Sequence, residues 1–164
     1  MAFFYIGSID MTGQGEFNFQ EEIEQLRERF AFDFIAIALV QPAERRFELK
    51  WTHATGNRSN RYRRIVLQTG KGVAGHVFKT GKPFLLEDTD SMLDANDLFN
   101  YPIVVAEGLK SFGAIPLYKY NRVKGVLLVG YRAGMKLTAE AFEKFQQVIG
   151  SEFGPFYDKE MVRG

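Results

Sequence analysis

The chain has 164 residues, with 21 Lys and Arg against 20 Asp and Glu, and its formal net charge at pH 7 is +1. This length fits one domain, and the near balance of charges gives no field that would favour nucleic acid or a membrane surface. The sequence contains no cysteine, which excludes disulfides, thiolate nucleophiles and cysteine-based zinc or iron–sulfur sites.

The first third of the chain predicts one helix followed by two strands. A capping box and apolar residues at helical spacing predict a helix over residues 18–30. Residues 33–40 are apolar on both faces, which indicates a strand in the middle of a sheet. Apolar and polar residues alternate over 47–53, so this segment is expected to be a half-buried strand with Trp51 and His53 on its inward face.

The middle of the chain predicts short elements joined by polar segments. Residues 57–64 are expected to form a basic loop and 65–67 a short strand, after which a glycine-rich turn opens a helix at Gly72. Another short strand is expected over 83–86. The acidic segment 87–97 lacks the spacing of a calcium-binding loop and is expected to be a solvated flap.

The last part of the chain predicts a short helix, a hairpin and a long helix. Pro102 fits the first turn of a helix that ends at Gly108. Strands over 111–118 and 123–131 are expected to form a hairpin, and the final helix begins at Thr138. One face of that helix is expected to carry Phe142, Phe145, Ile149 and Phe153. The layout indicates an α+β domain, an antiparallel sheet with helices on both faces.

The two short helices carry the candidate binding site. The helix at Gly72 opens without bulky or carboxylate side chains, so its free backbone N–H groups could meet a small anion. In the second helix Pro102 has no N–H group to offer, but Ile103 does. If both helices converge over the strand that holds Trp51 and His53, they enclose a small apolar cavity whose polar contacts are mainly backbone amides.

Such a cavity suits a small, weakly hydrated monoanion, because a phosphate would normally also require Lys or Arg. The alternative is that side chains and water cap both helix ends, and that Trp51 is an ordinary core residue. Catalysis finds no support. Glu87 and Asp88 are adjacent and would point opposite ways, and the two histidines, His53 and His76, suggest neither a triad nor a three-His metal site. No catalytic residue, metal or cofactor is therefore expected.

Four motifs in a fixed order make the chain resemble the GAF domain family. They are Gly70-x-Gly72-x-x-Gly75, Gly81-x-Pro83, the segment 110–117 and Gly125-Val126-Leu127. The resemblance covers nearly the whole chain and implies a single GAF domain over residues 18–158 after an N-terminal extension of residues 1–17. It also implies a ligand pocket on one face of the antiparallel sheet, with the terminal helices on the other face available for a homodimer.

Within this family the chain is similar to the NreA-type nitrate receptors of Gram-positive bacteria. That resemblance implies a receptor without enzymatic activity, which binds nitrate and modulates a sensor histidine kinase of a nitrate/oxygen two-component system in the regulation of nitrate respiration. It points to Trp51, Val73, Ala74, Tyr101 and Ile103 as nitrate-binding residues. The argument from the residues adds His53, Gly72 and Pro102 to this set.

Other functions within the family are less well supported. Free methionine sulfoxide reductases resemble this layout but need cysteines, and the Asn-Lys-x-Phe-Asp-Glu pattern of cyclic-nucleotide GAF domains is absent. A sensor of another small ligand, such as nitrite or a small organic acid, stays open, as does a dimerisation or interaction module without a ligand. No apolar run approaches the roughly 18 residues of a membrane span, and residues 1–7 lack the basic start of a signal peptide, so a cytoplasmic protein is expected.

Overall fold

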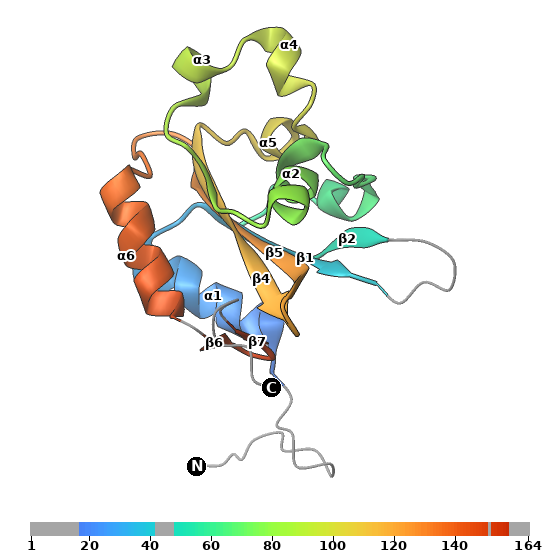
Figure 1. Cartoon of the computed structure of the whole chain (residues 1–164). Helices are drawn as coiled ribbons and strands as arrows, with labels where there is room; N and C mark the ends of the chain where they lie inside the picture. Colours follow the sequence, from blue (N-terminus) through green and yellow to red (C-terminus); the bar gives the residue numbers. More distant parts are fainter. Residues whose placement is uncertain (1–16, 42–47, 151, 158–164) are drawn as a thin grey trace.

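The computed structural model describes residues 17–41, 48–150 and 152–157. Its strands are β1 (Phe34–Val40), β2 (Leu49–Thr55), β3 (Phe84–Leu86), β4 (Ser111–Lys119), β5 (Arg122–Tyr131), β6 (Glu152–Phe153) and β7 (Phe156–Tyr157). They form a seven-stranded sheet in the order β2-β1-β5-β4-β7-β6, with β3 paired to β4 (Figure 1). Every pairing is antiparallel, which confirms the predicted sheet.

Helices cover both faces of the sheet, as the α+β prediction requires (Figure 1). One face carries α1 (Phe19–Phe30) and α6 (Ala139–Ile149), and the other carries the 3-10 helix η1 (Arg61–Arg64), α2 (Gly72–Thr80) and α5 (Pro102–Glu107). The one-turn helices α3 (Thr89–Met92) and α4 (Ala95–Leu98) connect β3 to α5. Among the residues described, none of the helices has the length and apolar character needed to span a bilayer.

Large side chains fill the core under α1 and α6. Phe145 of α6 meets Phe30 and Phe32 edge-on, with ring centroids 5.2 and 5.3 Å apart, an arrangement that aromatic rings favour. Gly113 of β4 lies under Phe142, whose ring would be 2.6 Å from a Cβ atom at that position. A side chain at position 113 would therefore not fit between β4 and α6.

Small side chains dominate the strand surface under α2 and α5. Ala36 and Ala38 of β1 and Ala114 of β4 are fully buried there, and Ala74 of α2 packs into the same cluster. Because alanine has little bulk, this surface leaves room for the wide indole of Trp51, which belongs to the cluster as well. The two faces of the sheet are thus filled in different ways. Most of the buried phenylalanines lie on the side of α1 and α6, whereas the other side combines Phe34 and Phe112 with several alanines and Trp51.

A β-bulge in β2 separates Trp51 from His53. Trp51 pairs with Ala38 and His53 pairs with Ile37, so Thr52 is an extra residue between two consecutive partners in β1. A bulge interrupts the alternation of side chains along a strand. Trp51 therefore packs under α2 and α5, whereas His53 lies on the opposite face of the sheet. The prediction that both side chains share the inward face is wrong for this reason.

The predicted hairpin, the short strand at β3 and the helix from Pro102 are all confirmed. The hairpin turns at Tyr120 and Asn121, whose φ angles of 54° and 63° suit the tight turn between two twisted strands. The helix from Pro102 ends at Gly108, which has a φ of 63° and donates its N–H to the end of the helix. Local turn chemistry predicts these boundaries well.

Three predicted segments differ in the structure. Residues 65–67 form no strand, and the basic loop 57–64 contains η1, which buries Tyr62. The acidic flap 87–97 is folded into α3 and α4, because aspartate side chains cap both helices. The final helix ends at Gly150, so Phe153 reaches the core from β6 instead of from a longer helix.

The ends of the domain are described only in part. Of the expected extension 1–17, only Phe17 lies within the described residues, and its ring packs edge-on against Phe19 and Phe153 at centroid distances of 4.9 and 5.0 Å. Phe17 thus contributes to the core under α1. The domain limits of 18–158 stay a prediction, since residues 1–16 and 158–164 lie outside the described residues.

Candidate functional site

The start of α2 is free of the side chains that usually occupy a helix N-terminus. Its N-cap residue, Lys71, makes no side-chain capping hydrogen bond, and the first turn holds no acidic residue. The first four N–H groups of an α-helix have no partner within the helix, and they carry partial positive charge. The start of this nine-residue helix is therefore suited to an anion.

The other helices show how unusual this start is. In the described part of the chain, α1, α3, α4 and α6 each have a side-chain cap, from Asn18, Asp88, Asp94 and Thr138 respectively, and each has an acidic residue in its first turn. Among the α-helices described, only α2 and α5 have neither feature. The two uncapped helices are also the two that cover Trp51. The two helix starts that lack side-chain caps therefore lie on the same face of the sheet, next to Trp51.

The glycines before and within α2 serve mainly to shape the turn. Gly70 and Gly72 have φ angles of 82° and 71°, a conformation that other residues adopt only at a cost. Gly75 lies against the preceding turn, where a Cβ atom would be 2.0 Å from the carbonyl oxygen of Gln68. A side chain at position 75 would thus clash with the turn before α2, so Gly75 allows the close packing of this turn on the helix. The candidate anion donors in the first turn of α2 are the backbone N–H groups of Gly72, Val73 and Ala74.

The start of α5 contributes apolar and aromatic walls. Ile103 is 2% exposed and packs in the cluster with Trp51, whereas Pro102 is exposed on the outer side of the helix. Tyr101 packs against the same cluster and stacks on Phe84 at a centroid distance of 6.3 Å. The carbonyl oxygen of Tyr101 accepts hydrogen bonds from the backbone N–H groups of Val104 and Val105 in α5. Because α5 has only six residues, its charge effect is smaller than that of α2.

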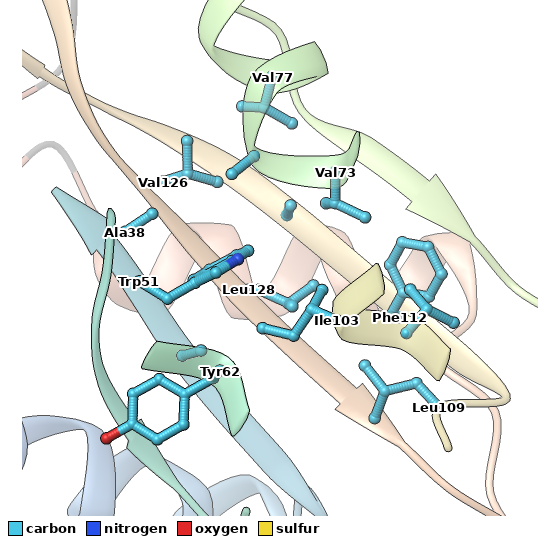
Figure 2. Close-up of a cluster of buried hydrophobic side chains, with 14 of the residues drawn as sticks. Ala38, Trp51, Tyr62, Val73, Val77, Ile103, Leu109, Phe112, Val126 and Leu128 are labelled. Carbon is cyan, nitrogen blue, oxygen red and sulfur yellow. The ribbon is translucent and has the colours of Figure 1, made fainter. Parts of the chain in front are cut away.

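Trp51 supplies the decisive observation at this site. Its side chain is 3% exposed, yet its indole Nε1 has no hydrogen-bond partner within the described part of the protein. Figure 2 shows the indole nitrogen directed toward the region between Val73 of α2 and Ile103 of α5. Buried N–H groups nearly always have a partner, and leaving one without costs about 1–3 kcal/mol. A donor kept without a partner beside two uncapped helices therefore points to a bound acceptor.

His53 lies outside this group of residues. Its ring is 5.5 Å from the ring of Phe19 of α1, and its Nδ1 is 2.8 Å from the hydroxyl oxygen of Thr52. Burial, and after it the positive charge of Arg63, lower the pKa of His53 from its ordinary value of 6.5. The structure thus brings five of the eight predicted residues into one cluster, namely Trp51, Val73, Ala74, Tyr101 and Ile103, with Gly72 at the adjoining start of α2. Pro102 is exposed on the outer side of α5, and His53 lies on the other face of the sheet.

The sequence analysis missed a buried ion pair that fixes the far end of α5. Glu107 is fully buried, and its Oε1 accepts hydrogen bonds from Arg132 Nη2 at 2.6 Å and from the backbone N–H of Arg58 at 2.8 Å. Arg132 Nη2 also donates to the backbone carbonyl of Gly56, and the backbone N–H of Arg132 donates to the carboxylate of Asp33. A glutamate directly before the helix-ending glycine looks like a solvated surface residue, so only the distant partner Arg132 could have revealed it.

The arrangement can bind a small anion but offers no reaction chemistry. Around Trp51 the polar groups include the indole N–H and the backbone N–H groups of α2, which are donors. Neither helix start brings a carboxylate or a nucleophile to the site. Within the described residues, no group of three or more His, Asp or Glu side chains could hold a metal ion.

Comparisons with known proteins give a consistent result. The model of a GAF domain matches residues 19–151. The chain is 38% identical to a mutated NreA protein from Staphylococcus aureus, altered in its nitrate binding site, with a TM-score of 0.70 and 73% of this chain and 87% of that chain covered.

Two more solved structures from S. aureus are similar to the chain. A second mutated NreA protein is 34% identical, with a TM-score of 0.70, and the match covers 77% of this chain and 96% of that chain. A hypothetical protein is 38% identical with a TM-score of 0.69, covering 73% of this chain and 96% of that chain. No curated protein matches significantly.

Proposed function

The chain belongs to the GAF domain family, and we propose that it is a cytoplasmic nitrate receptor with no catalytic activity of its own. The observation that carries this proposal is the indole N–H of Trp51, which is buried without a partner beside the uncapped start of α2. The similarity to NreA, which has a nitrate binding site, supports the choice of anion. The proposed contact residues are Trp51, Gly72, Val73, Ala74, Tyr101 and Ile103, whereas Pro102 starts α5 from its outer side.

The energetics favour a singly charged ion of low hydration. Taking an anion out of water costs several kcal/mol unless donors replace its hydration shell. Hydrogen bonds to a charged group contribute about 1.5–3 kcal/mol each, and the N-terminus of a helix adds about 0.3–2 kcal/mol. Trp51 and the first N–H groups of α2 can together offset the cost for one negative charge. A phosphate carries more charge than these neutral donors can replace.

The protein offers a direct probe of this site, because Trp51 is its single tryptophan. Adding nitrate should change the tryptophan fluorescence in a saturable way, and calorimetry should give a matching heat. Chloride, nitrite and formate, added at the same ionic strength, should bind less strongly. If millimolar nitrate produces neither heat nor a rise in Tm, the receptor proposal fails. Stronger binding of nitrite or formate would favour a sensor of that ligand, and no binding at all would favour an interaction module.

A substitution that keeps the aromatic ring tests the role of the indole N–H. Trp51→Phe removes one charge-assisted hydrogen bond, so nitrate affinity measured by calorimetry should fall at least about 10-fold. The stability of the protein should change by less than about 1 kcal/mol, because removing an unpaired buried donor offsets part of the lost packing. Phe145→Leu, a core change on the opposite face, is the matched control and should leave nitrate affinity unchanged. Equal affinity in both variants would remove Trp51 from the site.

We further propose that the nitrate-bound and nitrate-free forms act differently on a sensor histidine kinase, and that the protein forms a homodimer through α1 and α6. The resemblance to NreA-type receptors supports the kinase partner. Autophosphorylation of a purified kinase, measured with and without this protein and nitrate, tests that step. Sedimentation of wild type and of Val148→Glu, altered at an apolar side chain of α6 that is 40% exposed, tests the dimer.

A further inference from the structure

A cleft on the outer side of α5 is not used by the proposed nitrate site. It has a volume of about 400 Å³ and lies between η1 and α5, with Phe99 at one end. Its apolar lining includes Phe99 and Val105, which are 81% and 55% exposed. Large apolar side chains gathered at an open cleft are typical of a surface that another protein covers. We call this feature the α5 groove.

The charged side chains that line the α5 groove are all positive. Arg61 and Arg64 of η1 line it, and both side chains are exposed. No carboxylate lines the groove, and none of the ion pairs found within the described residues uses either arginine. The nearest acidic helix, α4, uses Asp94 and Asp97 to cap its own backbone. The groove therefore combines an apolar floor with two guanidinium groups that lack a carboxylate partner.

The α5 groove and the nitrate site share one helix. Ile103 and Val104 of α5 point into the cluster around Trp51, and Pro102 and Val105 of the same helix line the groove. A ligand that moves or steadies the start of α5 therefore also acts on the groove. The other end of α5 is held by the buried pair of Glu107 with Arg132, which leaves the start of the helix as the end more free to respond.

We propose that the α5 groove docks an acidic, apolar segment of a protein partner, and that nitrate changes its affinity for that segment through α5. The segment would bury apolar side chains against Phe99 and Val105 and would place carboxylates on Arg61 and Arg64. Arginine and aromatic residues are enriched at protein interfaces, where they carry much of the binding energy. The coupling to nitrate rests on the proposed function, whereas the docking surface does not.

A small organic anion is the less favoured occupant. Sites for small molecules bury about 70–90% of the ligand surface, whereas Phe99 is itself 81% exposed beside the α5 groove. A ligand lying against so open a wall would stay largely in water. A peptide or helix can instead cover the whole groove and extend beyond it.

Random 12-residue peptides displayed on phage provide the probe. The immobilised full chain should enrich peptides that combine Leu, Ile or Phe with Asp or Glu. A labelled synthetic copy of the most enriched peptide should bind wild type in a fluorescence anisotropy titration, with at least 10-fold weaker binding to Phe99→Ala and to the double variant Arg61→Glu, Arg64→Glu. A peptide with Lys in place of its acidic residues should recover binding to the double variant.

The matched control is Met135→Glu, at an apolar side chain that is 52% exposed and does not line the groove, and this variant should bind the peptide as wild type does. No enrichment, enrichment of peptides without acidic residues, or equal binding to Phe99→Ala would overturn the docking proposal. Saturation by a small organic anion with no peptide binding would do the same.

The coupling is tested by repeating the peptide titration with and without saturating nitrate, where at least a 3-fold change in affinity is expected. Unchanged peptide affinity in a protein that binds nitrate by calorimetry would overturn the coupling alone. If calorimetry shows no nitrate binding while the peptide results hold, the proposed function fails and the docking surface stands.

Discussion

The two faces of the sheet differ in how completely their polar groups are satisfied. Under α1 and α6, phenylalanine rings such as Phe30, Phe32 and Phe145 fill the space. Under α2 and α5, alanines surround Trp51, and both helix starts lack side-chain caps. The buried side-chain atoms without a hydrogen-bond partner in the described residues are Trp51 Nε1 and Glu107 Oε2, and both belong to the second face and its helices.

This difference between the two faces indicates that one face of the domain mainly provides stability and the other provides the binding site. Leaving a buried polar atom without a partner costs about 1–3 kcal/mol, and natural sequences tolerate such costs mainly at functional sites. The well-packed face under α1 and α6 can offset this cost without taking part in binding. Substitutions on the two faces should therefore affect different properties, and four variants test this division.

The largest effect is expected from Phe145→Ala on the packed face. Phe145 is fully buried, so its loss leaves a cavity and should lower the free energy of unfolding by about 3–5 kcal/mol. Urea denaturation followed by circular dichroism measures this change. Nitrate affinity of the folded protein should stay the same, and a parallel loss of nitrate binding would show that the two faces are not independent.

The next largest effect is expected from Glu107→Gln. Removing one partner of a buried ion pair leaves the other charge uncompensated and typically costs about 3–5 kcal/mol. We expect the lower end of this range, because Arg132 keeps its hydrogen bonds to backbone carbonyls. The variant should also weaken nitrate binding, since Glu107 holds the end of α5. Calorimetry at a temperature where the variant is fully folded would separate the two effects, and unchanged nitrate affinity would limit Glu107 to stability.

A smaller effect is expected from Gly75→Ala on α2. The new Cβ atom would lie 2.0 Å from the carbonyl oxygen of Gln68, so the turn before α2 must move, at a cost of about 1–3 kcal/mol. Gly134→Ala is the control, because its φ of 89° strains the chain by about 1–2 kcal/mol while no atom lies within 4 Å. Both should lower the Tm, but only Gly75→Ala should lower nitrate affinity. Equal nitrate affinity would show that the turn can move without disturbing the site.

The smallest effect concerns pH and His53. The pKa of His53 is below 6.5 in the folded protein, owing first to burial and then to Arg63. Between the folded pKa and 6.5 the unfolded chain binds more protons, so this histidine makes stability rise with pH up to about 6.5 and adds no slope above it. His53→Gln should reduce the loss of Tm between pH 7.5 and 5.5 relative to wild type. Nitrate affinity should be unchanged, since the His53 side chain is not proposed to contact the anion.

Sequence patterns predicted the parts of the fold that depend on neighbouring residues. The cap at Asn18, the turn at Tyr120 and the helix from Pro102 to Gly108 follow from local propensity, and the structure has each of them. The position of β1 inside the sheet followed from its apolar residues on both faces. The alternation of apolar and polar residues over 47–53 correctly predicted that Trp51 faces the site, and it failed only beyond Trp51, at the bulge.

The missed features depend on contacts between distant segments. The bulge at Thr52 exists only in relation to β1, and the partner of Glu107 lies 25 residues away at Arg132. The unpaired N–H of Trp51 could not be read from the sequence either, because it requires the position of every nearby acceptor. Such features give the candidate site its polarity, which explains why the sequence predicted its residues better than its geometry.

The bulge at Thr52 also determines where β2 tolerates a change in length. In the strand register, Thr52 is paired with no residue of β1. A chain that lacks Thr52 would therefore have a regular β2 strand, with Trp51 and His53 still on their present faces. A deletion at any other position of β2 would exchange the two faces for every residue beyond it. A homologue one residue shorter at Thr52 would lose the hydrogen bond from the Thr52 hydroxyl to the Ile37 carbonyl, but it should keep the same tryptophan site.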